Sequence, residues 1–332
     1  MTDEVILKVK DLRTYFYTDA GVVKAVDGIN FDLRKGEVLG IVGESGSGKS
    51  VTNLSIINLV SVPGKIKSGE VLYHDRDLLK MSDKEIRNIR GNKISMIFQD
   101  PMTSLNPFLK ISTQMIETIQ LHQGLNKVDA RKKAIEMLKL AGIPGAEERI
   151  DCYPHQFSGG MRQRVMIAMG LSCNPEILIA DEPTSALDVT IQAQILELMK
   201  DLTERLGTAV IMITHSLGVV AGMCDTINVM YAGRTVERAP TKELFKEPMH
   251  PYTQGLIASV PRLDKEVDGK LYSIPGVPPN VVDLPPCCPF YPRCSKAKDI
   301  CKKAYPPVNN FGNRHTCSCW LYATKEQEEA VK

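Results

Sequence analysis

Short runs of consecutive apolar residues predict buried strands at three places in the chain. They lie at residues 38–42, at 177–180 and in the segment TAVIMITHS, residues 208–216. Continuous apolar runs of this length are typical of strands covered on both faces, as in a parallel sheet. Such strands alternate with helical stretches over about 8–98 and again over about 170–237, and this alternation predicts an α/β fold.

The remaining segments follow other patterns. Helical periodicity dominates residues 99–169, for example in ARKKAIEMLKLAG. After about residue 247 the composition changes, because 12 of the 20 prolines lie within 248–307. Proline donates no hydrogen bond to a strand ladder, so we expect this part not to continue the sheet. The pattern predicts a main domain over 1–246, with a helical subdomain at about 99–169, and an irregular C-terminal extension over 247–332.

Composition and charge narrow the class of protein. Hydrophobic residues make up 43% of the chain and charged residues 24%, which is typical of a globular protein with a buried core. The net charge is +2 and no run of lysine or arginine stands out, so we expect no nucleic-acid partner. The N-terminus lacks the features of a signal peptide, and no segment reaches the roughly 18 apolar residues that span a bilayer. We therefore expect a cytoplasmic protein that reaches a membrane only through partners.

The segment GESGSGKS follows the first apolar run and precedes a helical stretch. Its G-x-x-x-x-G-K-[ST] pattern turns backbone N–H groups toward phosphate oxygens, and the following helix adds its positive dipole end. Lys49 would reach the β- and γ-phosphates, and the Ser50 hydroxyl would bind Mg²⁺. A flexible Gly/Ser loop is the alternative, but the strand before and the helix after are the context that the motif requires. The predicted nucleotide-binding residues are Gly43, Glu44, Ser45, Gly46, Ser47, Gly48, Lys49, Ser50 and Val51.

Polar residues also end the second and third apolar runs. Asp181 and Glu182 follow the second run, where Asp181 is suited to hold Mg²⁺ and Glu182 to polarise an attacking water. An acidic pair in this place is otherwise a solvated turn. His215 ends the third run, where open α/β sheets bind ligands, although a histidine beside a core strand can also be structural.

The segment YPHQFSGGMRQRVMIAMGL resembles the signature sequence of ABC-type ATPases. The phosphate loop, FQD at 98–100, this signature, the acidic strand end, SALD at 185–188 and His215 follow one another in the order of that family. The resemblance covers essentially the whole chain. It implies a P-loop ABC-type nucleotide-binding domain that binds ATP and Mg²⁺ and hydrolyses ATP.

The resemblance also implies roles for individual residues. Gln99 would contact Mg²⁺ and the attacking water, Glu182 would be the general base, and His215 would contact the γ-phosphate. Mg²⁺ would thus be held by Ser50, Gln99 and Asp181. The signature would bind the ATP of a second nucleotide-binding domain, through Ser158, Gly159 and Gly160.

An aromatic residue before the phosphate loop would stack on adenine. Phe16 fits the family spacing best, but Tyr15 and Tyr17 flank it. The chain departs from the commonest family pattern at Phe157, Met161 and Ser216. None of these departures removes a phosphate-contacting group.

Further phrases resemble the peptide and nickel importer branch of this family: VGESGSGKSVT, FQDPMTSLNP, EPMHPYTQGL, IPGVPPN and CPFYPRC. The branch implies an ATP-hydrolysing subunit that powers import of di- or oligopeptides from the cytoplasmic face of the membrane. Its expected partners are a second related ATP-binding subunit or a second copy of itself, two transmembrane permease subunits and, indirectly, an extracytoplasmic substrate-binding protein. A nickel importer is the main alternative. A soluble ABC ATPase would typically carry two cassettes or coiled-coil insertions, and a non-enzymatic regulator would be expected to lack Lys49 or Glu182.

Six of the nine cysteines lie between Cys287 and Cys319. A reducing compartment disfavours disulfides, and such clustering favours a metal site, although the spacing is not that of a zinc ribbon. Four thiolates on irregular loops suit an iron–sulfur cluster. The resemblance implies a structural 4Fe–4S cluster on Cys288, Cys294, Cys301 and Cys319, with Cys287 and Cys317 as neighbours that could substitute. We expect ordinary unpaired thiols at Cys152, Cys173 and Cys224.

Overall fold

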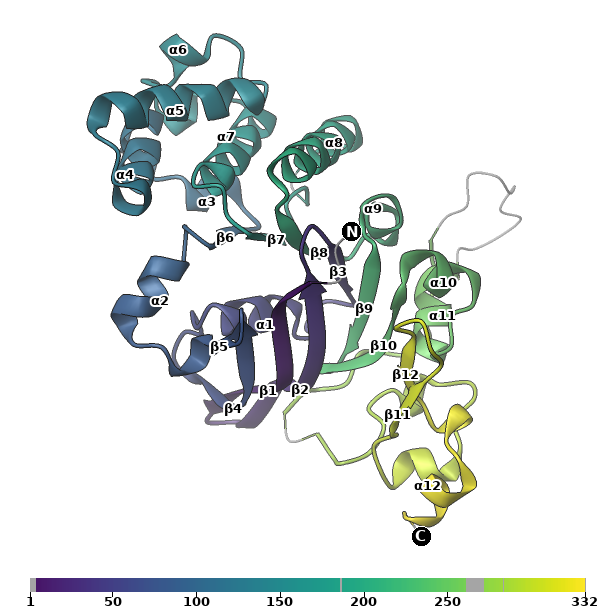
Figure 1. Cartoon of the computed structure of the whole chain (residues 1–332). Helices are drawn as coiled ribbons and strands as arrows, with labels where there is room; N and C mark the ends of the chain where they lie inside the picture. The colour runs from purple at the N-terminus through teal and green to yellow at the C-terminus, as the bar shows by residue number, and fades with distance from the viewer. Residues whose placement is uncertain (1–3, 186, 261–271, 283, 332) are drawn as a thin grey trace. The chain divides into compact units, whose positions relative to one another are not determined.

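The structure is a computed structural model that describes residues 4–185, 187–260, 272–282 and 284–331 (Figure 1). Ala186 of the SALD motif lies outside the described residues. The chain forms two compact units. The first unit consists of Met1–Ile6, Leu33–Val38 and Asp77–Ile213, and the second consists of Leu7–Asp32, Leu39–Arg76 and Thr214–Lys332. The predicted domain boundaries at residues 99, 169 and 246 stay predictions.

Three parallel strands form the sheet of the first unit. Strand β7 (Ile177–Asp181) lies between β6 (Ile94–Ile97) and β8 (Ala209–Ile213). Every residue of β7 and β8 is buried, as expected for a continuous apolar run in a parallel sheet. Helix α8 (Val189–Leu206) connects β7 to β8 and begins at Asp188, whose carboxylate accepts the Ile191 N–H at 3.0 Å.

Helices make up most of the remainder of the first unit. In chain order they are η1 (Leu78–Lys80), α2 (Asp83–Ile89), α3 (Pro101–Ser104), α4 (Ile111–Gln123), α5 (Lys127–Leu140), α6 (Ala146–Arg149), η2 (Pro154–Gln156) and α7 (Gly159–Leu171). Helices α4, α5 and α7 pack on one another, and α5 buries its apolar stripe in that contact. The predicted helical subdomain is therefore confirmed, and Figure 1 shows it as the group labelled α3 to α7.

The second unit contains an antiparallel sheet in the order β2-β1-β4-β5. Its strands are β1 (Val5–Thr18), β2 (Gly21–Arg34), β4 (Gly64–Tyr73) and β5 (Arg76–Asp77). A second set of strands runs in the order β3-β9-β10-β12-β11, in which β3 pairs with β9 in parallel and the other pairs are antiparallel. These strands are β3 (Val38–Val42), β9 (Thr226–Tyr231), β10 (Arg234–Pro240), β11 (Val308–Asn310) and β12 (Thr316–Ser318).

Short helices complete the second unit. Helix α1 (Lys49–Ile56) follows β3, and α9 (Leu217–Met223), α10 (Thr241–Lys246) and α11 (Pro251–Ala258) surround β9 and β10 in the sequence. The last part of the chain holds η3 (Tyr291–Arg293), η4 (Asp299–Lys302), η5 (Trp320–Tyr322) and α12 (Lys325–Glu329).

The expectation that the extension would not continue the sheet is wrong. Strand β12 pairs with β10, with Cys317 opposite Glu237, and β11 pairs with β12. The prolines of the extension end at Pro307, so the residues of β11 and β12 have the backbone N–H groups that a strand ladder needs. The proline content was judged over the whole extension, although residues 308–332 contain no proline.

A buried carboxylate connects the extension to β10. Glu237 is 0% exposed, and its oxygens accept the backbone N–H groups of Met249 at 2.7 Å and His250 at 2.9 Å. The ring Nε2 of His315, which lies just before β12, is 2.8 Å from the same carboxylate. Three donors therefore satisfy an anion that would be costly to bury alone.

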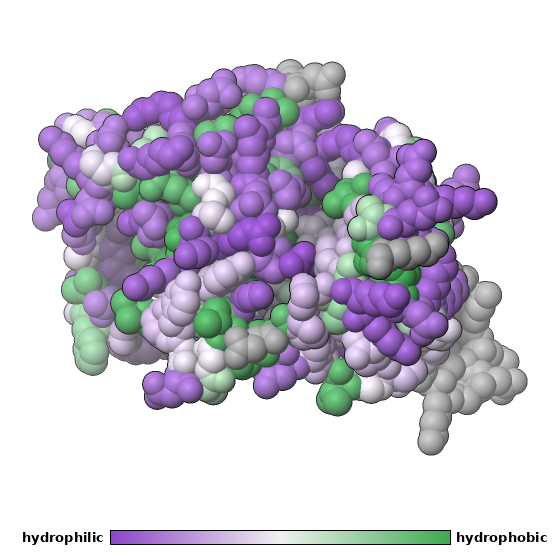
Figure 2. All heavy atoms as spheres, turned by 90° about the horizontal axis from the view of Figure 1, so that it is seen from below, coloured by the Kyte–Doolittle hydropathy of each residue, from purple (hydrophilic) through white to green (hydrophobic). Residues whose placement is uncertain are grey.

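No helix of the described chain has the length and apolar character needed to cross a membrane. Hydrophilic residues predominate on the face seen in Figure 2, and its apolar residues lie in small groups. Scattered apolar residues of this kind are ordinary for a folded protein surface.

Candidate nucleotide-binding site

The phosphate loop lies between β3 and α1 of the second unit. Two of its glycines have no room for a side chain: a Cβ at Gly43 would lie 2.2 Å from the carbonyl oxygen of Met230, and one at Gly48 would lie 2.1 Å from that of Ala25. Gly46 has open space around it but a φ of 77°, which favours glycine. Lack of space therefore requires glycine at positions 43 and 48, and backbone conformation favours it at position 46.

The interior of this loop is prepared for an anion. The Lys49 side chain is buried, and its Nζ donates to the carbonyl oxygens of Gly43 at 2.9 Å and Glu44 at 3.0 Å. The buried Ser47 hydroxyl has no hydrogen-bond partner among the described residues. Gly48 is the N-cap residue of helix α1, and it has no side chain with which to cap the free N–H groups. A buried cation, an orphaned hydroxyl and an uncapped helix start fit a bound phosphate group. Ser50 is exposed at the start of α1, and Val51 follows it.

The predicted catalytic carboxylate lies in the first unit, at the end of β7. Glu182 has a φ of 45°, and its backbone N–H donates to the carbonyl oxygen of Ile213 at 2.9 Å. The Nε2 atom of Gln99 donates to Glu182 Oε2 at 2.9 Å. Gln99 follows β6 and Glu182 follows β7, so the parallel pairing of these strands brings the two side chains together. Asp181, the last residue of β7, is buried.

The signature residues begin α7, also in the first unit. Ser158 is the N-cap, and its Oγ accepts the Met161 N–H at 3.4 Å. Ser158 and Gly159 are exposed, and Gly160 is packed so that a Cβ would lie 2.9 Å from the Ile191 side chain. The exposed N-terminus of this 13-residue helix is therefore open to a ligand that comes from outside the chain.

The structure separates the three aromatic candidates for adenine stacking. The hydroxyl of Tyr15 donates to Asp27 Oδ1 at 2.7 Å, so this side chain is engaged within the protein. Phe16 is half-buried and its ring lies over Gly64, whereas Tyr17 is 43% exposed. The hydrogen bond of Tyr15 leaves Phe16 and Tyr17 as the better candidates.

His215 lies in the second unit, two residues after the end of β8. It is exposed, which distinguishes it from a histidine packed in the core. The next backbone N–H, that of Ser216, donates to Thr214 Oγ1 at 3.0 Å and fixes the chain at this turn. Thus Gln99, Asp181, Glu182 and the signature belong to the first unit, and the phosphate loop, Phe16 and His215 belong to the second.

Four cysteines of the extension line one small cavity. They are the four selected by resemblance, namely Cys288, Cys294, Cys301 and Cys319. Cys287 and Cys317 do not line it. Burial raises the pKa of Cys288 to about 12 and that of Cys319 to about 11, so both thiols are protonated at neutral pH. Among the described residues, no group of three or more Cys, His, Asp or Glu is arranged to hold a metal ion. The donor set thus suits an iron–sulfur cluster in its chemistry, whereas its present arrangement does not form a metal site.

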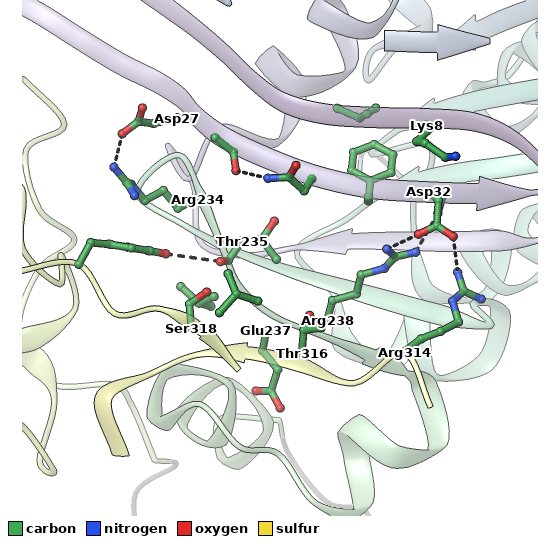
Figure 3. Close-up of a pocket in the computed structure, with 17 residues that line it drawn as sticks. Lys8, Asp27, Asp32, Arg234, Thr235, Glu237, Arg238, Arg314, Thr316 and Ser318 are labelled. Atoms are coloured by element: carbon green, nitrogen blue, oxygen red, sulfur yellow. Dashed lines mark hydrogen bonds and ion pairs between the residues drawn. The ribbon is translucent and has the colours of Figure 1, made fainter. Parts of the chain in front are cut away.

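A larger cavity, about 450 Å³, lies between β1 and β2 on one side and β10 and β12 on the other (Figure 3). Its charged side chains pair with one another. Asp32 contacts Arg238 at 2.6 Å and Arg314 at 3.9 Å, and Asp27 contacts Arg234 at 2.5 Å. Burial alone would raise the pKa of Asp32, but Arg238 and Arg314 outweigh it and hold that pKa below its usual value. The pairs with Arg234 and Arg238 join β2 to β10, and the pair with Arg314 joins β2 to the extension.

Two residues that the sequence analysis did not select contact the phosphate loop. Arg293 forms an ion pair with the Glu44 carboxylate at 2.7 Å, and the Tyr252 hydroxyl accepts the Glu44 N–H at 2.9 Å. Both lie in phrases noted only as marks of the family branch, CPFYPRC and EPMHPYTQGL. Their contact with the loop could not be found from sequence spacing, since Arg293 is 249 positions from Glu44.

Comparison with known proteins places these observations in a family. The family described as "ABC transporter" matches residues 26–185, and "Oligopeptide/dipeptide transporter, C-terminal region" matches residues 236–301. The oligopeptide transport ATP-binding protein OppD of Salmonella typhimurium is 51% identical over 316 residues, which cover 95% of this chain and 93% of that protein. The dipeptide transport ATP-binding protein DppD of Bacillus subtilis is 52% identical over 319 residues, which cover 96% of this chain and 95% of that protein.

Solved structures agree with the fold. One is the dimeric structure of the ATP-binding cassette MJ0796 in a post-hydrolysis state, bound to ADP and Pi. It has a TM-score of 0.64 and 30% identity, and the match covers 71% of this chain and 98% of the MJ0796 chain. The structure of cbiO1 from Clostridium perfringens has a TM-score of 0.62 and 32% identity, and the match covers 74% of this chain and 92% of cbiO1. Fold and site thus define an ABC-type ATPase, which confirms the α/β cassette and the ATPase activity expected from the sequence. Within that class, the chain belongs to the family of oligopeptide and dipeptide transport ATP-binding proteins.

Proposed function

We propose that this ATPase powers the import of di- or oligopeptides across the cytoplasmic membrane as a peripheral subunit on its cytoplasmic face. The observation that carries the proposal is the match, at about half identity and over nearly the whole chain, to proteins named for oligopeptide and dipeptide transport. The C-terminal region, residues 236–301, also matches the family described as "Oligopeptide/dipeptide transporter, C-terminal region". The cargo would be bound by other subunits.

For hydrolysis we propose an in-line attack of water on the γ-phosphate. The loop N–H groups and Lys49 would hold the phosphates, and phosphoryl transfer depends mainly on such positioning and charge stabilisation. Glu182 would take the proton of the attacking water, while the hydrogen bond from Gln99 keeps its carboxylate in one orientation. His215 would contact the γ-phosphate. Mg²⁺, held by Ser50, Gln99 and Asp181, would neutralise phosphate charge.

Two kinds of partner follow from this proposal. The exposed signature would bind the ATP of a second related subunit or a second copy of the chain, in a head-to-tail pair. Two apolar side chains that follow Gln99 in the sequence would meet the permease subunits: Met102 is 60% exposed and Phe108 is 86% exposed. Exposed apolar residues grouped in one segment favour a protein contact.

Uptake measurements test the cargo. Cells that lack this chain should lose uptake of labelled di- and oligopeptides and regain it with the wild-type chain, but not with Lys49→Ala. The chain should also co-purify with permease subunits from membrane extracts. Loss of nickel uptake with peptide uptake intact would favour the nickel importer, and absence of the chain from membranes would favour a soluble ABC ATPase.

We further propose that Cys288, Cys294, Cys301 and Cys319 hold a structural 4Fe–4S cluster. The support is that these four thiols, and not their two neighbours, line one cavity. A bound cluster would require thiolates, whereas burial raises the pKa of Cys288 and of Cys319, so cluster binding would be coupled to proton release from these two thiols. Anaerobically purified chain should be brown and contain about four irons.

The control for the cluster is a cysteine far from the cavity. Cys288→Ser should lose iron and colour, whereas Cys152→Ser should keep both. Colourless protein with one zinc would overturn the iron–sulfur assignment. Metal-free protein with a folded extension would overturn the metal site as a whole.

A further inference from the structure

The Arg293 side chain reaches the phosphate loop from the cysteine-rich segment. Only 5% of the side chain is exposed, and its two terminal nitrogens donate to the two Glu44 carboxylate oxygens at 2.7 and 3.0 Å. Its Nε donates to the Pro275 carbonyl at 2.9 Å, and Nη1 also contacts the Tyr231 hydroxyl at 3.3 Å. A guanidinium that binds both carboxylate oxygens and is itself fixed allows the Glu44 side chain one orientation.

A second contact from the same region holds the Glu44 backbone. The hydroxyl of the buried Tyr252 on α11 accepts the Glu44 N–H at 2.9 Å. The Tyr252 ring packs on Tyr231, with centroids 4.6 Å apart, and on Phe290, with centroids 5.4 Å apart. Phe290 lies between Cys288 and Arg293 in the sequence, so one aromatic cluster supports both contacts. The backbone and the side chain of Glu44 are thus both held from outside the loop.

The negative charge of Glu44 matters for phosphate binding. Glu44 is the second residue of a loop whose other groups attract anions, and its carboxylate has the same sign as a nucleotide phosphate. A free carboxylate here would weaken phosphate binding, because like charges at close range disfavour one another. We propose that Arg293 is a positioning residue of the nucleotide site, which neutralises the Glu44 carboxylate and holds it away from the place of the phosphates.

This role links ATP affinity to the extension. Arg293 directly precedes Cys294, one of the residues that line the four-cysteine cavity. The order of that segment therefore determines where the guanidinium lies. The inference rests on ATP binding, not on the peptide cargo or on a cluster, so its failure would leave both of those proposals standing.

A double-mutant cycle on the full-length chain tests the inference. ATP, ADP and AMP affinities are measured for wild type, Arg293→Gln, Glu44→Gln and the double variant, with thermal unfolding as a check on folding. Arg293→Gln should weaken ATP binding about tenfold in the wild-type background and no more than about twofold in the Glu44→Gln background. The loss should shrink from ATP to ADP to AMP, because the repulsion acts on phosphate charge. Arg205→Gln, which removes an exposed pair with Asp201, is the matched control and should change nothing.

Two results would overturn the proposal. An equal loss in both backgrounds would mean that Arg293 acts through folding of the extension, and unchanged affinity in every variant would mean that Glu44 needs no neutralisation. If Arg293→Gln does not fold, Arg293→Lys takes its place. Lysine keeps the charge but loses the two-pronged contact, so ATP binding should weaken only about threefold, again less in the Glu44→Gln background.

Discussion

Replacing Glu182 by glutamine isolates proton transfer from the other functions of this residue. Gln99 donates one hydrogen bond to Glu182 at 2.9 Å, and a glutamine oxygen can accept the same bond. The backbone φ of 45° disfavours glutamate and glutamine equally, so the strain at this position does not change. What Glu182→Gln removes is a proton acceptor, and general-base catalysis contributes about 10²- to 10⁴-fold. The expected rise in the activation barrier is therefore about 3–5 kcal/mol.

Phosphate release under single-turnover conditions measures this loss, and equilibrium binding should show ATP affinity at or above that of wild type. Sizing of Glu182→Gln with ATP, alone and with a candidate second subunit, should show a nucleotide-dependent dimer. Glu176→Gln is the matched control, because Glu176 precedes β7 at its other end and forms a partly exposed pair with Lys93 at 3.2 Å. Turnover of Glu182→Gln within tenfold of wild type, with the control unchanged, would refute its role as the base. A strict monomer under all these conditions would contradict the head-to-tail pair.

Three further predictions concern the phosphate loop and the extension. Gly48→Ala should abolish ATP binding in equilibrium measurements and lower the free energy of unfolding by about 3 kcal/mol, because its Cβ would lie 2.1 Å from a backbone carbonyl oxygen. Gly46→Ala meets only an unfavourable φ, so it should lower the free energy of unfolding by about 1 kcal/mol. Burial lowers the pKa of His250 to about 3. Below about pH 6.5 the unfolded chain therefore binds a proton at this histidine that the folded chain does not bind. The free energy of unfolding should fall by about 2 kcal/mol between pH 7 and pH 5. Urea unfolding of His250→Asn, which keeps a cap for the Tyr252 N–H, should show a weaker pH dependence; an equal slope would contradict this cause. Glu237→Ala leaves three buried donors without their acceptor and should lower the free energy of unfolding by about 3 kcal/mol, and a loss below about 1 kcal/mol would mean that water replaces the carboxylate.

Local sequence was sufficient for the features that depend on neighbouring residues. The strand, glycine loop and helix around Lys49 follow one another within twenty residues, and the apolar runs of β7 and β8 could be recognised alone. The meeting of Gln99 and Glu182 required one more step, the parallel pairing of β6 and β7. That pairing follows from the fold class, which the order of motifs along the chain had indicated.

Contacts between distant segments could not be predicted in this way. Nothing near Glu44 in the sequence indicates an arginine 249 positions away, and nothing near Tyr15 shows that Asp27 engages its hydroxyl. The sheet strands of the extension were missed for another reason, because the prolines before Pro307 dominated the composition of the whole segment. The Arg293–Glu44 pair, the Tyr15–Asp27 hydrogen bond and the pairing of β12 with β10 all depend on contacts between segments that are far apart in the sequence.

The buried carboxylate of Glu237 bears on how such subunits could be recombined. A chimera joined after β10 would combine the Glu237 of one parent with the His250 and His315 regions of another, and any mismatch would leave an anion in the core without its donors. The same junction would separate Tyr252 from the loop residue that it supports. The natural unit of exchange between relatives is therefore the cassette together with its extension, and evolution of the two parts is expected to be correlated at these positions.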